Sequence, residues 1–237
     1  MKILGITLLL GFISLTLNAQ KIIEKNIDYK NQFISIDVKF ATDIEIKTWD
    51  KSTVYFKADI YTKDGKFIDL YRLDVDVNNN KILFTSDAMP IFKASRKDCV
   101  KNNPNKKRYC YNNGDWSNFS YTIYVPKNAK FKVSSINGHL TSEIIEGDFE
   151  AELINGDISI ANYNGNLDLS TINGEIDLKM NNTNLVAETI HGDIYADEKL
   201  NFTSTDRHVG QKIKGSVGQG KNRLRLNTIN GNMYLRL

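Results

Sequence analysis

The feature that most constrains this chain is a short phrase, Ile-Asn-Gly or Ile-His-Gly followed by alternating apolar residues. It begins at Ile136, Ile154, Ile172, Ile190 and Ile229. Glycines lie nine residues apart at positions 138, 147, 156, 165 and 174; position 183 holds Thr and 192 is Gly again. The Ile-x-Gly glycines at 138, 156, 174 and 192 form a stricter set with a period of 18. A phrase that recurs within one domain indicates architecture rather than a catalytic motif.

The residues around Gly174 show which conformation the phrase favours. Ile172, Ile176 and Leu178 alternate with polar residues, which is the pattern of a half-buried strand. Asn-Gly is also a strong signal for a two-residue hairpin, but a hairpin exposes one isoleucine of every unit. A chain that runs on through the glycine buries both isoleucines. We therefore expect one continuous core that contains Ile154, Ile158, Ile172, Ile176, Leu178, Ile190 and Ile194.

This pattern predicts an all-β protein, a single-domain parallel β-solenoid of the β-helix or β-roll kind. Each coil has about 18 residues in two nine-residue strand units, and coils stack about 4.8 Å apart. Further strands are expected at 33–40, 43–49, 53–61, 73–77, 81–86 and 121–126, and no stretch shows a helical period. One domain, 20–237, then consists of irregular strands over 20–135, with an insertion at 93–117, and a repeat-rich part over 136–237.

The first 19 residues have the composition of a cleaved secretory signal peptide. One Lys precedes an apolar run from Ile3 to Leu17, and Ala19 suits cleavage. The alternative is a membrane anchor, but the run is shorter than the roughly 20 residues of a spanning helix. No second long apolar run follows. We therefore expect an exported protein, in the periplasm or at the cell surface, without a transmembrane span in the mature chain.

The repeats, the leader and the strand-rich N-terminal half together resemble a bacterial envelope family, the β-strand-repeat proteins or putative adhesins with head-GIN-like domains. The resemblance covers most of the mature chain and is strongest from Ile136 to Ala196, where the units read Ile-Asn-Gly-x-Ile-x-Ile. It implies an exported β-solenoid that binds a partner and performs no catalysis. It implies nothing about the insertion, which departs from the family pattern.

Charge is distributed unevenly along the mature chain. The net charge is +7 over 20–135, −12 over 136–198 and +7 over 199–237, although the whole chain carries only +3. In a solenoid of 18-residue coils, Asp157, Glu175 and Asp193 would form one outward column with Asp177 beside it. Such a column is either a solvated acidic face or a site for Ca²⁺, which prefers oxygen ligands. The units lack the paired glycines of calcium β-rolls.

The insertion is the other candidate site. Cys99 and Cys110 lie in it, and in an exported protein we expect them to form a disulfide. Basic groups attract phosphate and carboxylate, and aromatic rings stack on sugars. The candidate contacts are Lys101, Lys106, Lys107, Arg108, Tyr109, Tyr111 and Trp116. An envelope glycan, lipopolysaccharide or a surface protein is the expected partner, and nucleic acid is not; the alternative is a solvated loop.

Catalytic motifs are missing from the sequence. No G-x-S-x-G, H-E-x-x-H or phosphate-binding loop occurs, and His191 takes the Asn position of its repeat. No cofactor is expected. The sequence therefore predicts an exported, non-enzymatic β-solenoid that serves as an adhesin or cell-envelope binding protein. The alternatives are an exported polysaccharide-acting enzyme on a β-helix scaffold and a Ca²⁺-dependent structural protein of the envelope.

Overall fold

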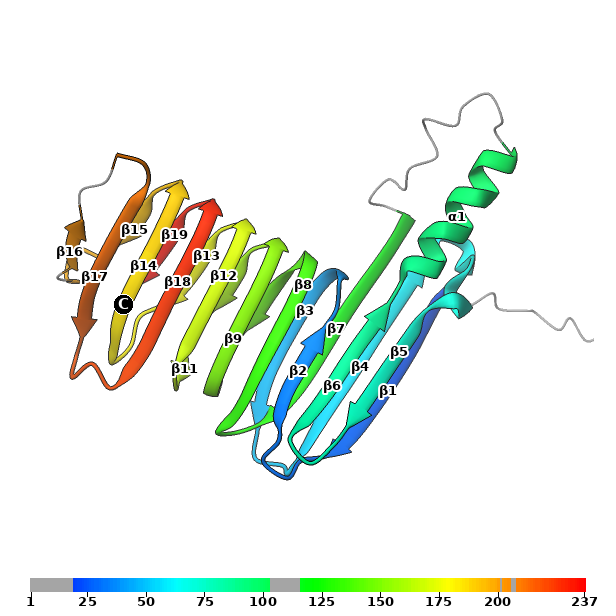
Figure 1. Ribbon diagram of the computed structural model, residues 1–237, viewed down its shortest axis with the longest axis horizontal. Coiled ribbons are helices and arrows are strands. Elements are labelled where there is room, and N and C mark those ends of the chain that lie inside the picture. The colour runs from blue at the N-terminus through cyan, green and yellow to red at the C-terminus, as the bar shows by residue number, and fades with distance from the viewer. Residues whose placement is uncertain (1–18, 103–115, 201, 206–207) are drawn as a thin grey trace, which may run out of the picture.

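The computed structural model describes residues 19–102, 116–200, 202–205 and 208–237. Over these residues β-strands predominate, as predicted, and they form one hydrogen-bonded sheet system that folds into two layers (Figure 1). No helix in these ranges is long and apolar enough to cross a bilayer.

The N-terminal half contains β1 (Gln20–Asp28), β2 (Phe33–Asp37), β3 (Phe40–Trp49), β4 (Thr53–Thr62), the short 3₁₀ helices η1 (Lys63–Gly65) and η2 (Ile68–Leu70), β5 (Arg72–Val77), β6 (Lys81–Asp87), α1 (Met89–Asn102) and β7 (Ser117–Pro126). The C-terminal half contains β8 (Ala129–Ser142), β9 (Ile145–Asn155), β10 (Ile158–Ile160), β11 (Tyr163–Asn164), β12 (Leu167–Asn173), β13 (Ile176–Lys179), β14 (Thr183–His191), β15 (Ile194–Ala196), β16 (Phe202–Thr205), β17 (Gln211–Val217), β18 (Asn222–Asn230) and β19 (Met233–Arg236).

The two layers share the long strand β8. Layer A has the order β5-β6-β2-β8-β9-β12-β18-β14-β17-β16, and its neighbours pair side by side. Layer B has the order β1-β4-β7-β3-β8-β10-β13-β19-β15. The start of β8 belongs to layer A and its end to layer B. The apolar side chains of both layers fill the space between them and form the core.

The 18-residue period appears directly in the parallel pairing of the middle strands. In layer A, Phe149 pairs with Phe131 on one side and with Leu167 on the other. In layer B, Ile158 pairs with Leu140 and with Ile176. Each 18-residue unit therefore adds one strand to each layer.

The order of the last units differs from the prediction. The period places the unit of Ile190 directly on that of Ile172, but β18 and β19 from the C-terminus lie between them (Figure 1). Antiparallel pairs also occur: β1–β4, β4–β7, β5–β6, β14–β17 and β16–β17. The sheet is therefore mixed, and the prediction of a wholly parallel solenoid is not confirmed.

The predicted core is correct for only part of each phrase. Ile158, Ile176 and Leu178 are fully buried, and Ile194 is half-buried. The prediction was wrong for three isoleucines that are each about 40% exposed, namely Ile154 (40%), Ile172 (40%) and Ile190 (41%). The chain does run through the glycine, but it turns a corner there, so the alternation of inward and outward side chains restarts.

Thr171 shows how the corner is built. It takes the inward position before Ile172 and is 3% exposed. Its hydroxyl donates a hydrogen bond of 2.9 Å to the carbonyl oxygen of Gly156, one coil away. Thr228 and Thr189 make the same contact, with Gly174 and Gly231 respectively. A buried threonine therefore donates the hydrogen bond that the buried carbonyl oxygen at the corner requires, and an isoleucine has no donor for it.

The glycine of the phrase is required by a close approach between coils. A Cβ atom on Gly174 would lie 2.1 Å from the carbonyl oxygen of Gly156, and one on Gly231 would lie 1.9 Å from that of Gly174. No side chain fits at such distances. Glycine lets successive backbones stack directly at the corner.

The asparagine of the phrase forms a ladder along the same corner. Asn155 donates to Asn137 at 3.0 Å, Asn173 to Asn155 at 2.8 Å, and Asn230 to Asn173 at 2.7 Å, each from Nδ2 to Oδ1. His191 pairs next to Asn230 and ends the row. Threonine, asparagine and glycine thus have structural roles that explain why the phrase recurs.

Helix α1 was not predicted. The Asp87 carboxylate accepts a hydrogen bond from the Met89 backbone N–H at 3.0 Å, and Pro90 lies in the first turn, where its missing N–H has no cost. Ile91 is fully buried and Phe92 partly so, which anchors the first turn to the core. The insertion therefore begins as a helix rather than as an irregular loop.

Candidate functional site

Helix α1 carries the basic residues of the insertion that the structure describes. It lies at the N-terminal end of the strand stack and projects from it (Figure 1). Lys93, Lys97 and Lys101 recur every four residues and are exposed. Residues at this spacing lie on one face of a helix. We call these three lysines the basic stripe.

The electrostatic balance of α1 is strongly positive. The helix also contains Arg96, which is exposed, and a single acidic residue, Asp98. The Asp98 carboxylate interacts with Lys66 from outside the helix, with 3.9 Å between the charged atoms. The one acid of the helix therefore already faces an additional cation, and the surface of α1 attracts anions.

The other candidate contacts of the insertion have different outcomes. Lys106, Lys107, Arg108, Tyr109 and Tyr111 lie outside the described residues, as does Cys110. The disulfide between Cys99, on α1, and Cys110 stays a prediction. Trp116 is half-buried and packs against the core, so only part of its ring remains for contact with a ligand.

The predicted acidic column is interrupted. Asp157 and Glu175 are neighbours, and the Glu175 backbone N–H donates to the Asp157 carboxylate at 2.8 Å. Asn232, which directly precedes β19, then lies between Glu175 and Asp193 and bonds to both residues. Arg236 of β19 bonds the Asp177 carboxylate. Within the described ranges, no group of three or more His, Cys, Asp or Glu side chains is placed to hold a metal ion.

Basic strands also neutralise the acidic middle on layer A. Lys132 Nζ lies 2.7 Å from the Glu150 carboxylate and 2.6 Å from that of Glu152, and Lys212 lies 3.0 Å from Glu188. The hydrogen bond from Lys132 lowers the pKa of the Glu150 carboxyl. The charge blocks of the sequence thus become opposite-charge pairs on neighbouring strands.

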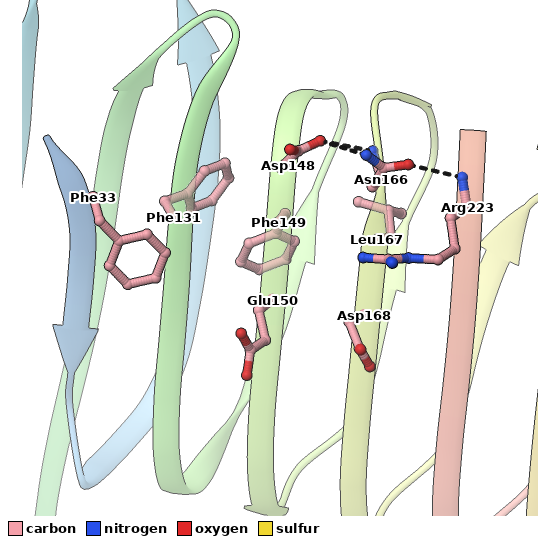
Figure 2. A pocket seen from close by; sticks show the side chains of 9 residues that line it. All are labelled: Phe33, Phe131, Asp148, Phe149, Glu150, Asn166, Leu167, Asp168 and Arg223. Carbon is pink, nitrogen blue, oxygen red and sulfur yellow. Dashed lines mark hydrogen bonds between the residues drawn. The ribbon is translucent and has the colours of Figure 1, made fainter. Parts of the chain in front are cut away.

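A small hollow on layer A is lined by nine residues, of which Asp148, Asn166 and Arg223 bond one another (Figure 2). Its volume is about 150 Å³. Asn166 donates to the Asp148 carboxylate at 2.8 Å and accepts from the Arg223 backbone N–H at 2.9 Å. Burial raises the pKa of Asp168 at its edge, and Arg225 opposes that effect. Ligand pockets usually exceed about 300 Å³, so this hollow is too small for an organic ligand.

An aromatic group on layer B serves the fold. The Trp49 ring lies 4.9 Å from that of Tyr124, which lies 5.8 Å from that of Tyr55. The Trp49 indole N–H donates to the Thr53 carbonyl at 2.8 Å, closing the turn between β3 and β4, and Lys51 Nζ lies 4.5 Å from the Trp49 ring. These rings contact each other and the chain's own lysine, which stabilises the turn.

Comparisons with known proteins support the fold. No protein-family model matches the sequence, and no curated protein matches it. A solved structure of a putative cell adhesion protein from Clostridium sporogenes is similar, with a TM-score of 0.60 and 11% identity over 92% of this chain and 99% of that one. A putative adhesin from Bacteroides fragilis aligns over 91% of this chain and 97% of its own, with 13% identity and a TM-score of 0.33. At this identity the first likeness establishes a shared fold, and the second carries no argument.

Proposed function

We propose that this chain is an exported, non-enzymatic binding protein of a bacterial cell envelope, comparable to an adhesin, and that it binds an anionic envelope polymer. Residues 20–237 form its mature domain after removal of residues 1–19. The observation that carries the proposal is the basic stripe on α1. The strand stack serves as the mount from which this helix projects (Figure 1).

The geometry of the stripe suits a polymer with repeated negative charges. A helix rises about 1.5 Å per residue, so Lys93, Lys97 and Lys101 follow one another at about 6 Å along the axis. A row of cations at this spacing can contact successive phosphate or carboxylate groups of one chain. Because Ile91 anchors the helix in the core, little ordering of the helix opposes binding.

Two strongly buried titratable groups, the hydroxyls of Tyr71 and Tyr121, stabilise the core and do not reach a substrate. Burial raises the pKa of the Tyr71 and Tyr121 hydroxyls, which lie 3.2 Å apart. Both side chains are almost fully buried between the two layers. A catalytic acid or base must reach a substrate, and these hydroxyls do not.

The test is retention of the purified mature protein on lipopolysaccharide and on isolated cell-wall glycan. The variant in which Lys93, Lys97 and Lys101 are all replaced by Gln should be retained severalfold more weakly than the wild-type protein. Raising the salt concentration should weaken it in the same way, because exposed charges are screened within about 10 Å at 0.1 M. A second variant, in which Lys106, Lys107 and Arg108 are replaced by Ala, tests the remaining cations of the insertion.

The matched control removes three exposed lysines elsewhere, at Lys25, Lys30 and Lys130. It changes the net charge by the same amount and should leave retention nearly unchanged. If the control binds as poorly as the stripe variant, net charge rather than α1 governs retention. Retention that is indifferent to salt would also contradict the proposal.

A further inference from the structure

A larger hollow lies on layer B and is lined by residues on and next to β13, β15 and β19. These strands lie toward the end of the stack opposite the end that carries α1 (Figure 1). Its volume is about 380 Å³, within the usual range of ligand pockets. Two tyrosines, Tyr195 and Tyr234, form one wall, and Asp177, Asp197 and Arg236 provide its charged groups.

The aromatic wall is fixed in position. Tyr195 and Tyr234 pair in register on β15 and β19, with ring centroids 5.4 Å apart and planes at 10°. The Tyr195 hydroxyl donates to Asp193 and the Tyr234 hydroxyl to Glu175, each at 3.4 Å. Tyr195 is nevertheless 52% exposed. The two rings thus stack on each other, and the Tyr195 ring is open to solvent.

The polar groups are not fully used by the protein. Arg236 bonds one oxygen of the Asp177 carboxylate, whereas the other oxygen, Oδ1, is buried and has no hydrogen-bond partner. Because Oδ1 is shielded, the 32% exposure of the Asp177 side chain lies on its other atoms, and Oδ2 has lone pairs left for a second donor from a ligand. The Arg236 side chain is 65% exposed and keeps donors free for an acceptor.

We propose that this hollow binds a neutral pyranose sugar. The apolar C–H face of the ring packs on the exposed ring of Tyr195, one hydroxyl donates to Asp177 Oδ2, and another accepts from Arg236. A neutral ligand fits the charges best, because Asp177 and Asp197 repel an anion and Arg236 repels a cation. The site differs from the basic stripe in ligand class and in location, so it goes beyond the function proposed above.

The test is saturation-transfer NMR and calorimetry on the intact mature protein. The probes are four neutral tetrasaccharides, of glucose, mannose, galactose and N-acetylglucosamine. At least one should bind, with an affinity unchanged in 0.5 M NaCl. Tyr195→Ala should weaken that binding about tenfold or more, whereas Tyr195→Phe, which keeps the ring, should stay within about twofold.

Two further variants keep the result interpretable. Tyr61→Ala removes a comparably exposed tyrosine elsewhere on the surface, at 39% exposure, and should have no effect. Asp177→Asn removes the acceptor charge and should weaken binding even if Tyr195→Ala disturbs the edge strand. The inference is overturned if none of the four probes binds, or if binding survives both Tyr195→Ala and Asp177→Asn. Either result leaves the basic stripe untouched, because its test uses anionic polymers.

Discussion

Two isoleucines of the same phrase should respond very differently to truncation. Ile176 is fully buried between Ile158 and Met233 on the neighbouring strands, whereas Ile172 is 40% exposed. Replacement by Ala removes three carbon atoms, each worth about 0.8 kcal/mol when buried. For Ile176→Ala this is about 2.4 kcal/mol, and the enclosed cavity raises it to about 3–4 kcal/mol. Ile172→Ala should lower the free energy of unfolding by only about 1 kcal/mol, because its site is open.

The assay is thermal unfolding of the two variants beside the wild type. For a domain of this size, 1 kcal/mol corresponds to about 2–4 °C in the melting temperature. We therefore expect a decrease of about 6–16 °C for Ile176→Ala and about 2–4 °C for Ile172→Ala. Equal decreases would refute the reasoning, since they would place both side chains in the core. A larger decrease for Ile172→Ala would mean that Ile172, and not Ile176, points into the core.

Two further outcomes follow from the geometry of the fold, and a third follows from the sequence. Gly174→Ala places a Cβ atom 2.1 Å from a backbone carbonyl oxygen, so calorimetry should show a loss of at least about 3 kcal/mol or no folded protein; a fully stable variant would contradict the direct stacking. Lys132→Met should reduce the unfolding free energy more at pH 7 than at pH 3. Lys132 lowers the pKa of the Glu150 carboxyl in the folded state. The Lys132–Glu150 pair therefore stabilises the fold fully above the ordinary carboxyl pKa, and this stabilisation is lost as the pH falls through the lowered pKa. An equal loss of unfolding free energy at both pH values would exclude a stabilising ion pair. Mass spectrometry of exported protein should find Cys99 bonded to Cys110, and two free thiols would rule the disulfide out.

The sequence contains a signal for the start of helix α1, but the alternation of strand residues does not reveal it. Asp87 before Met89 and Pro90 is a helix start, and Ile91 and Phe92 follow as a short apolar face. Only this first turn packs on the core, so the apolar pattern is too short to show a helical period. The basic stripe could not be recognised before the helix was known, because its lysines share a face only at helical spacing.

The isoleucines show a different limit. Alternation correctly predicted Ile176 and Leu178 as core residues, because both follow the corner in one unbroken strand. It failed for Ile172, because side chains before and after a corner do not share one alternation. Thr171 is polar and seemed unsuited to the core, yet its hydroxyl bonds the carbonyl oxygen of Gly156 inside it. This hydrogen bond between coils is the reason that Thr171, and not Ile172, points into the core. Its partner is 15 residues away in the sequence, so local alternation does not reveal it.

The repeated phrase alone was enough to predict short strands and an 18-residue period, but not the corner at each glycine. The order of the coils depended on tertiary structure, because the phrases at 171–174, 189–192 and 228–231 are nearly identical and any of them can stack on another. Direct stacking of the 189–192 unit on the 171–174 unit would place Asp193 beside Glu175. The insertion of β18 and β19 between them separates these carboxylates with Asn232 and brings Arg236 to Asp177. Like charges on adjacent strands are unfavourable and opposite charges are favourable, so the basic C-terminus lies within the acidic middle of the chain.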